Sequence, residues 1–338
     1  MPELVPADAL LAPVPVLDDR GRVALPVRFV DLDAPVPPGA LDAAARATGV
    51  VVGIARGGPV PPGVADALDL TLAPVAAGRS TVAVPDVLAA ADRLAQAVAA
   101  APSAATVLAG LLRWSGTLPV PAALDAESLA YSTLLGGPEF AGWLARRGPR
   151  PLPPAVPAPV LVARSGGELR ITLDRPERRN AYGRQLRDAL VDALTVAELD
   201  PGVERVVLTG NGVSFCSGGD LDEFGTTPDL VTAHLVRTRA GAALPMARLA
   251  DRLEVRVHGA CVGAGIELPA YAGRVVAAPD ARFVLPEVAM GLIPGAGGTV
   301  SIPRRIGRWR TLWLALTGAP LDARTALEWG LVDAVEDR

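Results

Sequence analysis

The stretch "VHGACVGAGIELP", residues 257–269, brings a single carboxylate, Glu267, to the end of a run of small residues. An apolar, strand-like approach precedes Gly263, Ala264 and Gly265. Small residues let the backbone approach a ligand or another strand closely. A charge that enters apolar surroundings must be paired, neutralised or used. The stretch by itself therefore leaves two interpretations open, which are structural tight packing and a ligand site.

The composition limits the class of protein. The chain has 338 residues, enough for two domains and a large core. Its formal net charge is −4 and half of it is hydrophobic. That balance argues against a nucleic-acid partner, which usually needs a clustered basic face. All 32 basic residues are arginine, so chemistry that depends on a lysine, such as a Schiff base or a Walker lysine, is excluded.

The numbers of cysteines and histidines limit the disulfides and metal sites that the chain can form. The chain has two Cys and two His, too few for a disulfide framework, and their spacing indicates no metal site. The N-terminus is interrupted by prolines and has no basic region, so we expect no secretory signal peptide. Uninterrupted apolar runs stay below the roughly 20 residues of a membrane span. We expect a soluble, cytoplasmic protein with no membrane partner.

A proline-rich segment, "RRGPRPLPPAVPAPV" at 146–160, divides the chain. Its prolines prevent a continuous helix and favour a semi-rigid linker. We therefore predict a first domain over 1–148, a linker over 149–159 and a second domain over 160–338. Strand-like runs separated by helical patterns predict an α/β architecture for the second domain. The first domain is also read as α/β, with no catalytic constellation and with its carboxylates on solvated helix faces.

Several catalytic motifs are missing from the chain. A dinucleotide fingerprint would need a third glycine where "GAGIEL" has Leu268. The phosphate-binding loop requires a lysine, and no G-x-S-x-G elbow is present. His258 lies at the end of a predicted strand, where a structural hydrogen bond is the favoured interpretation.

Four segments in order carry a family resemblance: "DRPERRNAY" (174–182), "SFCSGGDL" (214–221), "HGACVGAGIEL" (258–268) and "LPEVAMGLIPGAGGT" (285–299). Together they resemble the crotonase, or enoyl-CoA hydratase/isomerase, superfamily, over about residues 160–338. The resemblance implies a fold of ββα superhelical turns and an acyl-CoA thioester substrate. No separate cofactor is implied, because CoA is part of the substrate.

The resemblance also assigns roles to residues. It places an oxyanion hole at the backbone N–H groups of Gly219 and Ala264, where loss of one donor typically costs about 10²–10³ in rate. Both glutamates of the family's hydratases are present, as Glu267 and Glu287. By this resemblance Glu267 activates water and Glu287 handles the proton at Cα. Two carboxylates around one water also raise one pKa, so that an acid and a base coexist near neutral pH.

Further residues of the same motifs are expected to contact CoA: Arg178, Arg179, Ala181, Ser217, Gly218, Asp220 and Leu221. Of these, Asp220 is expected to cap or turn its loop. Cys216 and Cys261 stand where the family has small residues and are interpreted as buried filler. Reversible hydration of a 2-enoyl-CoA is the leading interpretation. Double-bond isomerisation, a specialised enolate reaction (oxygenase or hydrolase) and a non-catalytic partner subunit remain open.

The chain departs from the family at Ala264, Pro269 and Gly273 and at its C-terminal end. Ala264 replaces the usual central glycine, so an extra methyl narrows the expected site. The sequence ends at Arg338, where the family usually continues into helices that cover the site and help to form a trimer. Residues 88–150 resemble that missing tail. We hypothesise that the N-terminal domain is a degenerate crotonase-like unit whose helices replace the cover, in a homo-oligomer such as a trimer or a dimer of trimers.

Overall fold

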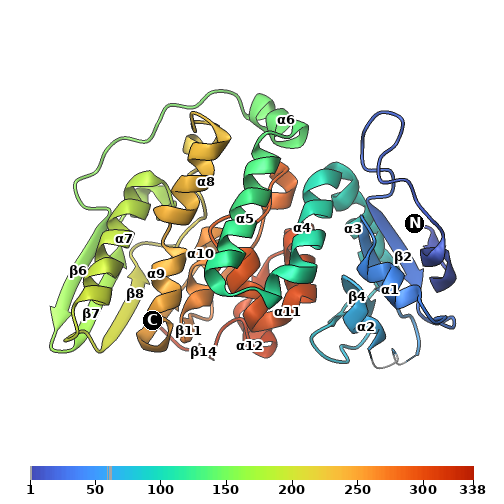
Figure 1. The fold of residues 1–338 in the computed structure, drawn as a ribbon. Helices are drawn as coiled ribbons and strands as arrows, with labels where there is room; N and C mark the ends of the chain where they lie inside the picture. The colour runs from blue at the N-terminus through green and yellow to red at the C-terminus, as the bar shows by residue number, and fades with distance from the viewer. Residues whose placement is uncertain (1, 59, 61–62) are drawn as a thin grey trace.

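Two mainly parallel sheets lie toward opposite ends of the molecule, with helices between them (Figure 1). The structure, a computed structural model, describes residues 2–58, 60 and 63–338. The first sheet has five parallel strands in chain order, namely β1 (Leu4–Val5), β2 (Val27–Asp31), β3 (Val50–Ile54), β4 (Leu70–Ala73) and β5 (Thr81–Ala83). Strand β3, "VVVGI", is buried throughout, as a central parallel strand covered on both faces should be.

The second domain contains a six-stranded and a three-stranded sheet. The larger sheet runs in chain order through β6 (Val160–Ser165), β7 (Glu168–Leu173), β8 (Arg205–Gly210), β9 (Leu253–Val257), β11 (Arg274–Ala277) and β14 (Ala334–Val335). Only the β6–β7 hairpin is antiparallel within it. The smaller sheet joins β10 (Ala260–Val262), β12 (Arg282–Val284) and β13 (Leu321–Asp322). The predicted α/β class is confirmed, whereas a common origin of the two domains stays a prediction.

Helices pack on these sheets and against one another. The first domain contributes α1 (Ala40–Ala45), α2 (Val64–Ala67), α3 (Val87–Ala100), α4 (Pro102–Trp114), α5 (Val120–Leu135) and α6 (Pro138–Arg147). The second contributes α7 (Arg184–Leu199), α8 (Leu230–Arg239), α9 (Ala243–Arg248), α10 (Ala264–Glu267), α11 (Gly298–Thr317) and α12 (Ala323–Trp329). Short 3₁₀ turns η4 (Leu221–Glu223) and η7 (Glu287–Met290) border the site described below.

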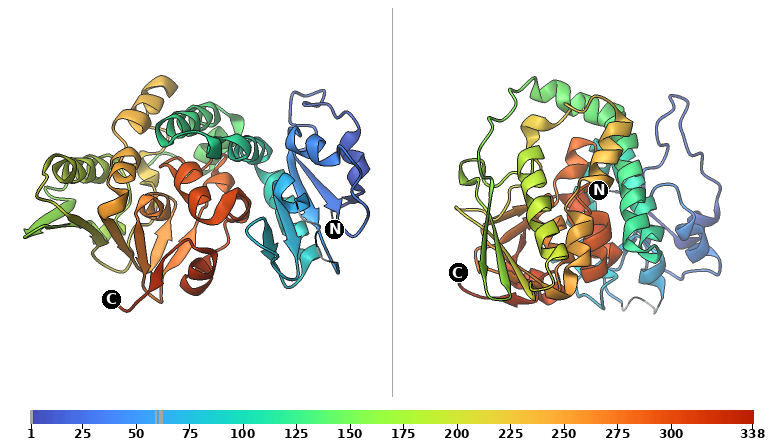
Figure 2. Two further views of the ribbon diagram at one scale, coloured as in Figure 1. Left: turned by 60° about the horizontal axis from the view of Figure 1, so that its bottom comes forward. Right: turned by 60° about the vertical axis from the view of Figure 1, so that its left-hand side comes forward.

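Helices α4 and α5 join the two domains instead of standing apart with the first sheet (Figures 1 and 2). One hydrophobic core runs from the first sheet through α3, α4 and α11 into the second domain. Ser128 of α5 donates to the carbonyl of His234 on α8, which fixes these two helices side by side. Residues 149–159 run as irregular chain from α6 back to β6. No single described helix is long and apolar enough to span a membrane.

A buried carboxylate, Asp69, fastens the first sheet to the helices. It accepts the amide of Val51 at 2.8 Å and the Nε of Arg113 at 2.8 Å. Arg308 of α11 approaches the same carboxylate at 3.5 Å, so both domains meet at this charge. Breaking a buried pair is strongly destabilising because it leaves an uncompensated charge.

We predict that Asp69→Asn lowers the free energy of unfolding by about 3 kcal/mol, because Arg113 loses its buried partner. Urea unfolding followed by circular dichroism measures this change. Glu328→Gln is the matched control, since its ion pair with Arg324 is exposed and should contribute less than about 0.5 kcal/mol. Equal losses in the two variants would contradict the assignment.

Candidate active site

A cavity of about 420 Å³ lies where the two domains meet. Helices α5 and α6 line it from the first domain, and α8 lines it from the second. The residues that line it include Gly219, Ala264, Glu267 and Glu287, so the structure brings the four predicted catalytic positions to one cavity.

The two glutamates converge on a glycine turn. Gly263, just before α10, has φ +49° and ψ −119°, a conformation that L side chains rarely adopt. A Cβ at Gly263 would collide with Oε1 of Glu287 and would stand 3.6 Å from Oε1 of Glu267. The turn therefore needs glycine for its backbone angles and also for the space that the two carboxylates occupy.

The two carboxylates differ in their hydrogen bonds. Oε2 of Glu267 accepts the amides of Ala296 at 2.8 Å and of Gly298 at 2.9 Å. Oε2 of Glu287 is buried and has no hydrogen-bond partner among the described residues. Donors to a carboxylate favour its charged form, and their absence favours the neutral form. The hydrogen bonds therefore favour the charge on Glu267 more than on Glu287, against burial, which raises the pKa of both.

A third carboxylate reaches the same turn from the first domain. Glu127 of α5 accepts the amide of Gly297 at 2.7 Å, and it accepts the amide and hydroxyl of Thr299 at 2.9 and 2.7 Å. The amides of residues 296 and 298 thus bind Glu267, while those of 297 and 299 bind Glu127. The turn 295–299 is held from both sides by alternating amides.

Burial shifts the pKa of all three carboxyl groups upward. It raises the pKa of Glu287 to about 8 and, against three hydrogen bonds that favour the charge, the pKa of Glu127 to about 7. Burial and then the charges of Glu287 and Glu127 raise the pKa of Glu267 well above its ordinary value. Interacting carboxyl groups of this kind release their protons as a set. Near neutral pH the site can therefore hold both an acid and a base.

Two amides face the cavity without an internal acceptor. The N–H groups of Gly219 and Ala264 donate no hydrogen bond within the described part of the chain, and both residues line the cavity. Orphan amide donors are suited to stabilise negative charge that develops on a ligand oxygen. An oxyanion hole at these two residues stays a prediction.

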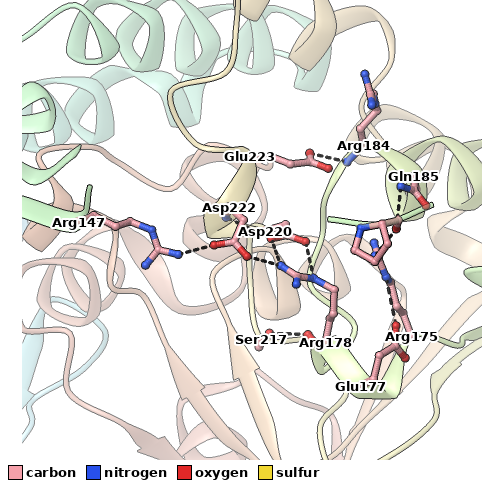
Figure 3. Close-up of polar contacts among 11 residues, drawn as sticks. Arg147, Arg175, Glu177, Arg178, Arg184, Gln185, Ser217, Asp220, Asp222 and Glu223 are labelled. Atoms are coloured by element: carbon pink, nitrogen blue, oxygen red, sulfur yellow. Dashed lines mark hydrogen bonds and ion pairs between the residues drawn. The ribbon is translucent and has the colours of Figure 1, made fainter. Parts of the chain in front are cut away.

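Two of the predicted CoA-contact residues, Arg178 and Asp220, belong to an ion network (Figure 3). Arg178 donates to both oxygens of Asp220 at 3.0 and 2.6 Å and to Asp222 at 2.8 Å. Arg147 of α6 reaches Asp222 from the first domain at 2.8 Å. These hydrogen bonds raise the pKa of Arg178 and bind the loop 217–222 to the first domain.

The other predicted CoA-contact residues vary in position. Asp220 lines the cavity and also accepts the amide of Asp222 at 3.2 Å, as a cap of η4. The cavity lining does not include the remaining ones: Arg178, Arg179, Ala181, Ser217, Gly218 and Leu221. Contact of these six residues with CoA stays a prediction.

The remaining reactive side chains have structural surroundings. Cys216 and Cys261 are free and buried, and burial raises the pKa of the Cys216 thiol to about 12. The Nε2 of His258 lies 3.1 Å from the carbonyl oxygen of Gly212. Neither cysteine nor His258 lines the cavity.

Comparison with known proteins fits this geometry. The enoyl-CoA hydratase/isomerase family profile matches residues 164–338. The chain belongs to this family. It is 37% identical to the 1,2-epoxyphenylacetyl-CoA isomerase of Escherichia coli K12, over 51% of this chain and 67% of that one. It is 36% identical to the 2,3-dehydroadipyl-CoA hydratase of the same organism, over 52% and 68%.

A solved family structure covers the same region. An enoyl-CoA hydratase/isomerase from Mycobacterium paratuberculosis superposes with a TM-score of 0.50 and 32% identity. The match covers 54% of this chain and 74% of that one. The crotonase fold predicted for the second domain of this hydratase/isomerase family member is therefore confirmed.

Sequence reasoning expected helices from residues 88–150 to cover the site, but it did not assign Glu127 to the site. The first domain was expected to keep its carboxylates on solvated faces, but Glu127 is buried in the site, so that expectation is wrong for this residue. Leu124, Glu127, Tyr131 and Leu135 share one face at helical spacing. A glutamate on an otherwise apolar helix face is the sequence signal that could have assigned Glu127 to the site.

We predict that Glu127→Ala speeds amide exchange at residues 296–299 by at least about tenfold, because the turn loses three hydrogen bonds and opens locally. Hydrogen exchange followed by mass spectrometry or NMR measures the change. Exchange at 296 and 298 should also rise, although those amides bind Glu267.

Glu139→Ala is the matched control. Glu139 also belongs to the first domain and accepts two amides, of Ser103 at 2.7 Å and of Ala104 at 3.1 Å. This variant should loosen the start of α4 and leave residues 296–299 protected. Unchanged protection of 296–299 in Glu127→Ala would show that Glu127 does not hold the turn.

We predict that stability depends on pH through Glu287. Its folded pKa of about 8 lies above the ordinary value of 4.5, so the folded state binds more protons between these values. The free energy of unfolding then falls as the pH rises through that window. Glu287→Gln should lose the contribution of this residue to the slope, while those of Glu127 and Glu267 remain, and should gain about 1–3 kcal/mol relative to wild type between pH 5 and pH 8. Glu328→Gln, whose ion pair is exposed, is the control, and parallel curves for wild type and Glu287→Gln would refute the prediction.

Proposed function

We propose that this family member is an enoyl-CoA hydratase, which adds water reversibly across the double bond of a 2-enoyl-CoA thioester. The observation that carries the proposal is the convergence of Glu267 and Glu287 on Gly263, beside the orphan amides of Gly219 and Ala264. A relative that hydrates a CoA thioester by name is 36% identical to the chain, which supports the same reaction class. The substrate brings its own CoA, so no further cofactor is proposed.

The proposed mechanism uses each group once. The thioester oxygen accepts the amides of Gly219 and Ala264, which stabilise the enolate that forms when a nucleophile attacks Cβ. Glu267, whose charge is favoured by two amide donors, takes a proton from water as the oxygen bonds to Cβ. Glu287, whose Oε2 accepts nothing among the described residues, delivers its proton to Cα. A proton then returns from Glu267 to Glu287 through solvent, so both carboxyl groups regain their starting states and the net change is the addition of one water.

Isomerisation is the other activity named among the relatives, since one of them is an isomerase. Moving a double bond requires removal and return of a proton and needs no water. The presence of two converging carboxylates favours hydration, because one can activate water while the other serves Cα.

We predict that wild-type protein removes the conjugated thioester absorbance of crotonyl-CoA and of longer 2-enoyl-CoAs. Glu267→Gln and Glu287→Gln should each lower kcat by about 10³, within the range of a general acid or base. Product analysis by mass spectrometry should show a gain of one water. Glu328→Gln, a surface variant far from the cavity lining, should keep the wild-type rate.

Two outcomes would overturn the proposal. The first is no hydration of any enoyl-CoA while CoA thioesters still bind, which would favour isomerisation or another enolate reaction. The second is no binding of CoA thioesters, which would favour a non-catalytic partner subunit.

A further inference from the structure

A guanidinium lies against the cavity wall with no carboxylate in direct contact. Arg237 of α8 lines the cavity and is partly buried. No described carboxylate lies within 4.0 Å of its nitrogens. By contrast Arg187, which also lines the cavity, pairs with Asp188 at 2.7 Å. Glu127 attracts Arg237 without contacting it, and it already accepts hydrogen bonds from Gly297 and Thr299. A carboxylate on a ligand would give this partly buried cation a direct partner.

Neutral groups hold Arg237 in place. Its Nε donates to the hydroxyl of Ser128 at 3.1 Å, and its Nη2 donates to the carbonyl of Ser128 at 3.2 Å and to the hydroxyl of Ser132. Its guanidinium carbon stands 4.4 Å from the centre of the Tyr131 ring. The remaining nitrogen, Nη1, donates to no described residue. It is not fully buried, so a ligand can reach it. The side chain is thus oriented by α5 while one donor stays open.

The position of Arg237 relative to the glutamates follows from Tyr131. That ring packs so closely on Gly295 that a Cβ there would overlap it, and Gly295 begins the turn that binds Glu267. Arg237 covers the Tyr131 ring, so the cation and the turn that binds Glu267 contact the same aromatic side chain. Apolar groups line the same cavity and are suited to methylene groups: Leu124, Ala233, Val236 and Ala243.

We infer that the acyl chain of the substrate ends in a carboxylate that Arg237 binds, so that the substrate is the mono-CoA thioester of a dicarboxylic acid. This inference rests on the proposed binding of an acyl-CoA at the same cavity. Arginine is suited to this role because its planar fork matches a carboxylate. Burial lowers the pKa of Arg237, and a bound carboxylate would offset that loss of solvation.

The test compares two thioesters of equal chain length, the mono-CoA ester of trans-2-hexenedioic acid and trans-2-hexenoyl-CoA. Wild type should show a kcat/KM at least about tenfold higher for the first, as expected for a hydrogen bond between charged groups. Arg237→Gln should reduce this ratio at least tenfold. Arg239→Gln is the matched control, because Arg239 lies on the same helix, is exposed and does not line the cavity. It should keep the wild-type ratio.

Binding separates this inference from the proposed reaction. Calorimetry with the saturated hexanedioyl-CoA and hexanoyl-CoA measures the same preference without turnover. If neither enoyl thioester is hydrated, the hydratase proposal fails, and the binding ratio still decides the role of Arg237. Equal affinities, or a preference for the neutral chain, would overturn the inference.

The phosphates of CoA are the other anions of the substrate that an arginine can bind. If Arg237 binds a CoA phosphate, Arg237→Gln should weaken both thioesters equally, and the effect should disappear with dephospho-CoA thioesters. That result would also overturn the inference. A loss confined to the dicarboxylic thioester, in both CoA and dephospho-CoA forms, supports it.

Discussion

The alternating hydrogen bonds of the turn 295–299 connect the two domains of this protein to one site. Consecutive backbone amides point to opposite sides of the turn, so one side serves Glu267 and the other serves Glu127. Buried carboxylates need such donors, and buried amides need such acceptors. The turn cannot move without disturbing both. Its glycines follow from this arrangement, because a Cβ at Gly298 would meet the Glu267 side chain at 2.6 Å.

Through this arrangement the first domain contributes side chains to the site. Helix α5 supplies Glu127 to the turn and Tyr131 to the cavity wall, and α6 supplies Arg147 to the loop that carries Asp222. The first sheet in turn supports these helices through a shared core and through Asp69. The first sheet therefore helps to position Glu127 in the cavity.

Three buried carboxyl groups close together are unfavourable for folding, since burial and mutual repulsion oppose their charges. Their pKa values are accordingly raised, at Glu267 as well as at Glu287, whose Oε2 has no donor among the described residues. Such a group lowers stability at neutral pH and keeps a proton available for chemistry. Hydrogen bonds distinguish its neighbour Glu267, which accepts two amides. The difference in donors, more than burial, separates the roles of the two glutamates.

Local sequence patterns were sufficient for some of these features. Glycine and alanine around Glu267, the buried run of β8 and the ordered motifs led to the α/β fold and to four residues that share the cavity. The contact of Glu127 with Gly297 spans 170 residues, and nothing local in either segment specifies the other. Arg178 shows the same limit, because its partners Asp220 and Asp222 become neighbours only when the loop folds onto it.

The central claim is that Glu127 acts through the turn that holds Glu267. A double-mutant cycle on kcat for a 2-enoyl-CoA substrate, with Glu127→Gln and Glu267→Gln, tests it most directly. We predict that Glu127→Gln lowers kcat strongly in wild type and little when Glu267 is already replaced, with an interaction energy of at least about 1 kcal/mol. Additive effects of the two substitutions would contradict the claim.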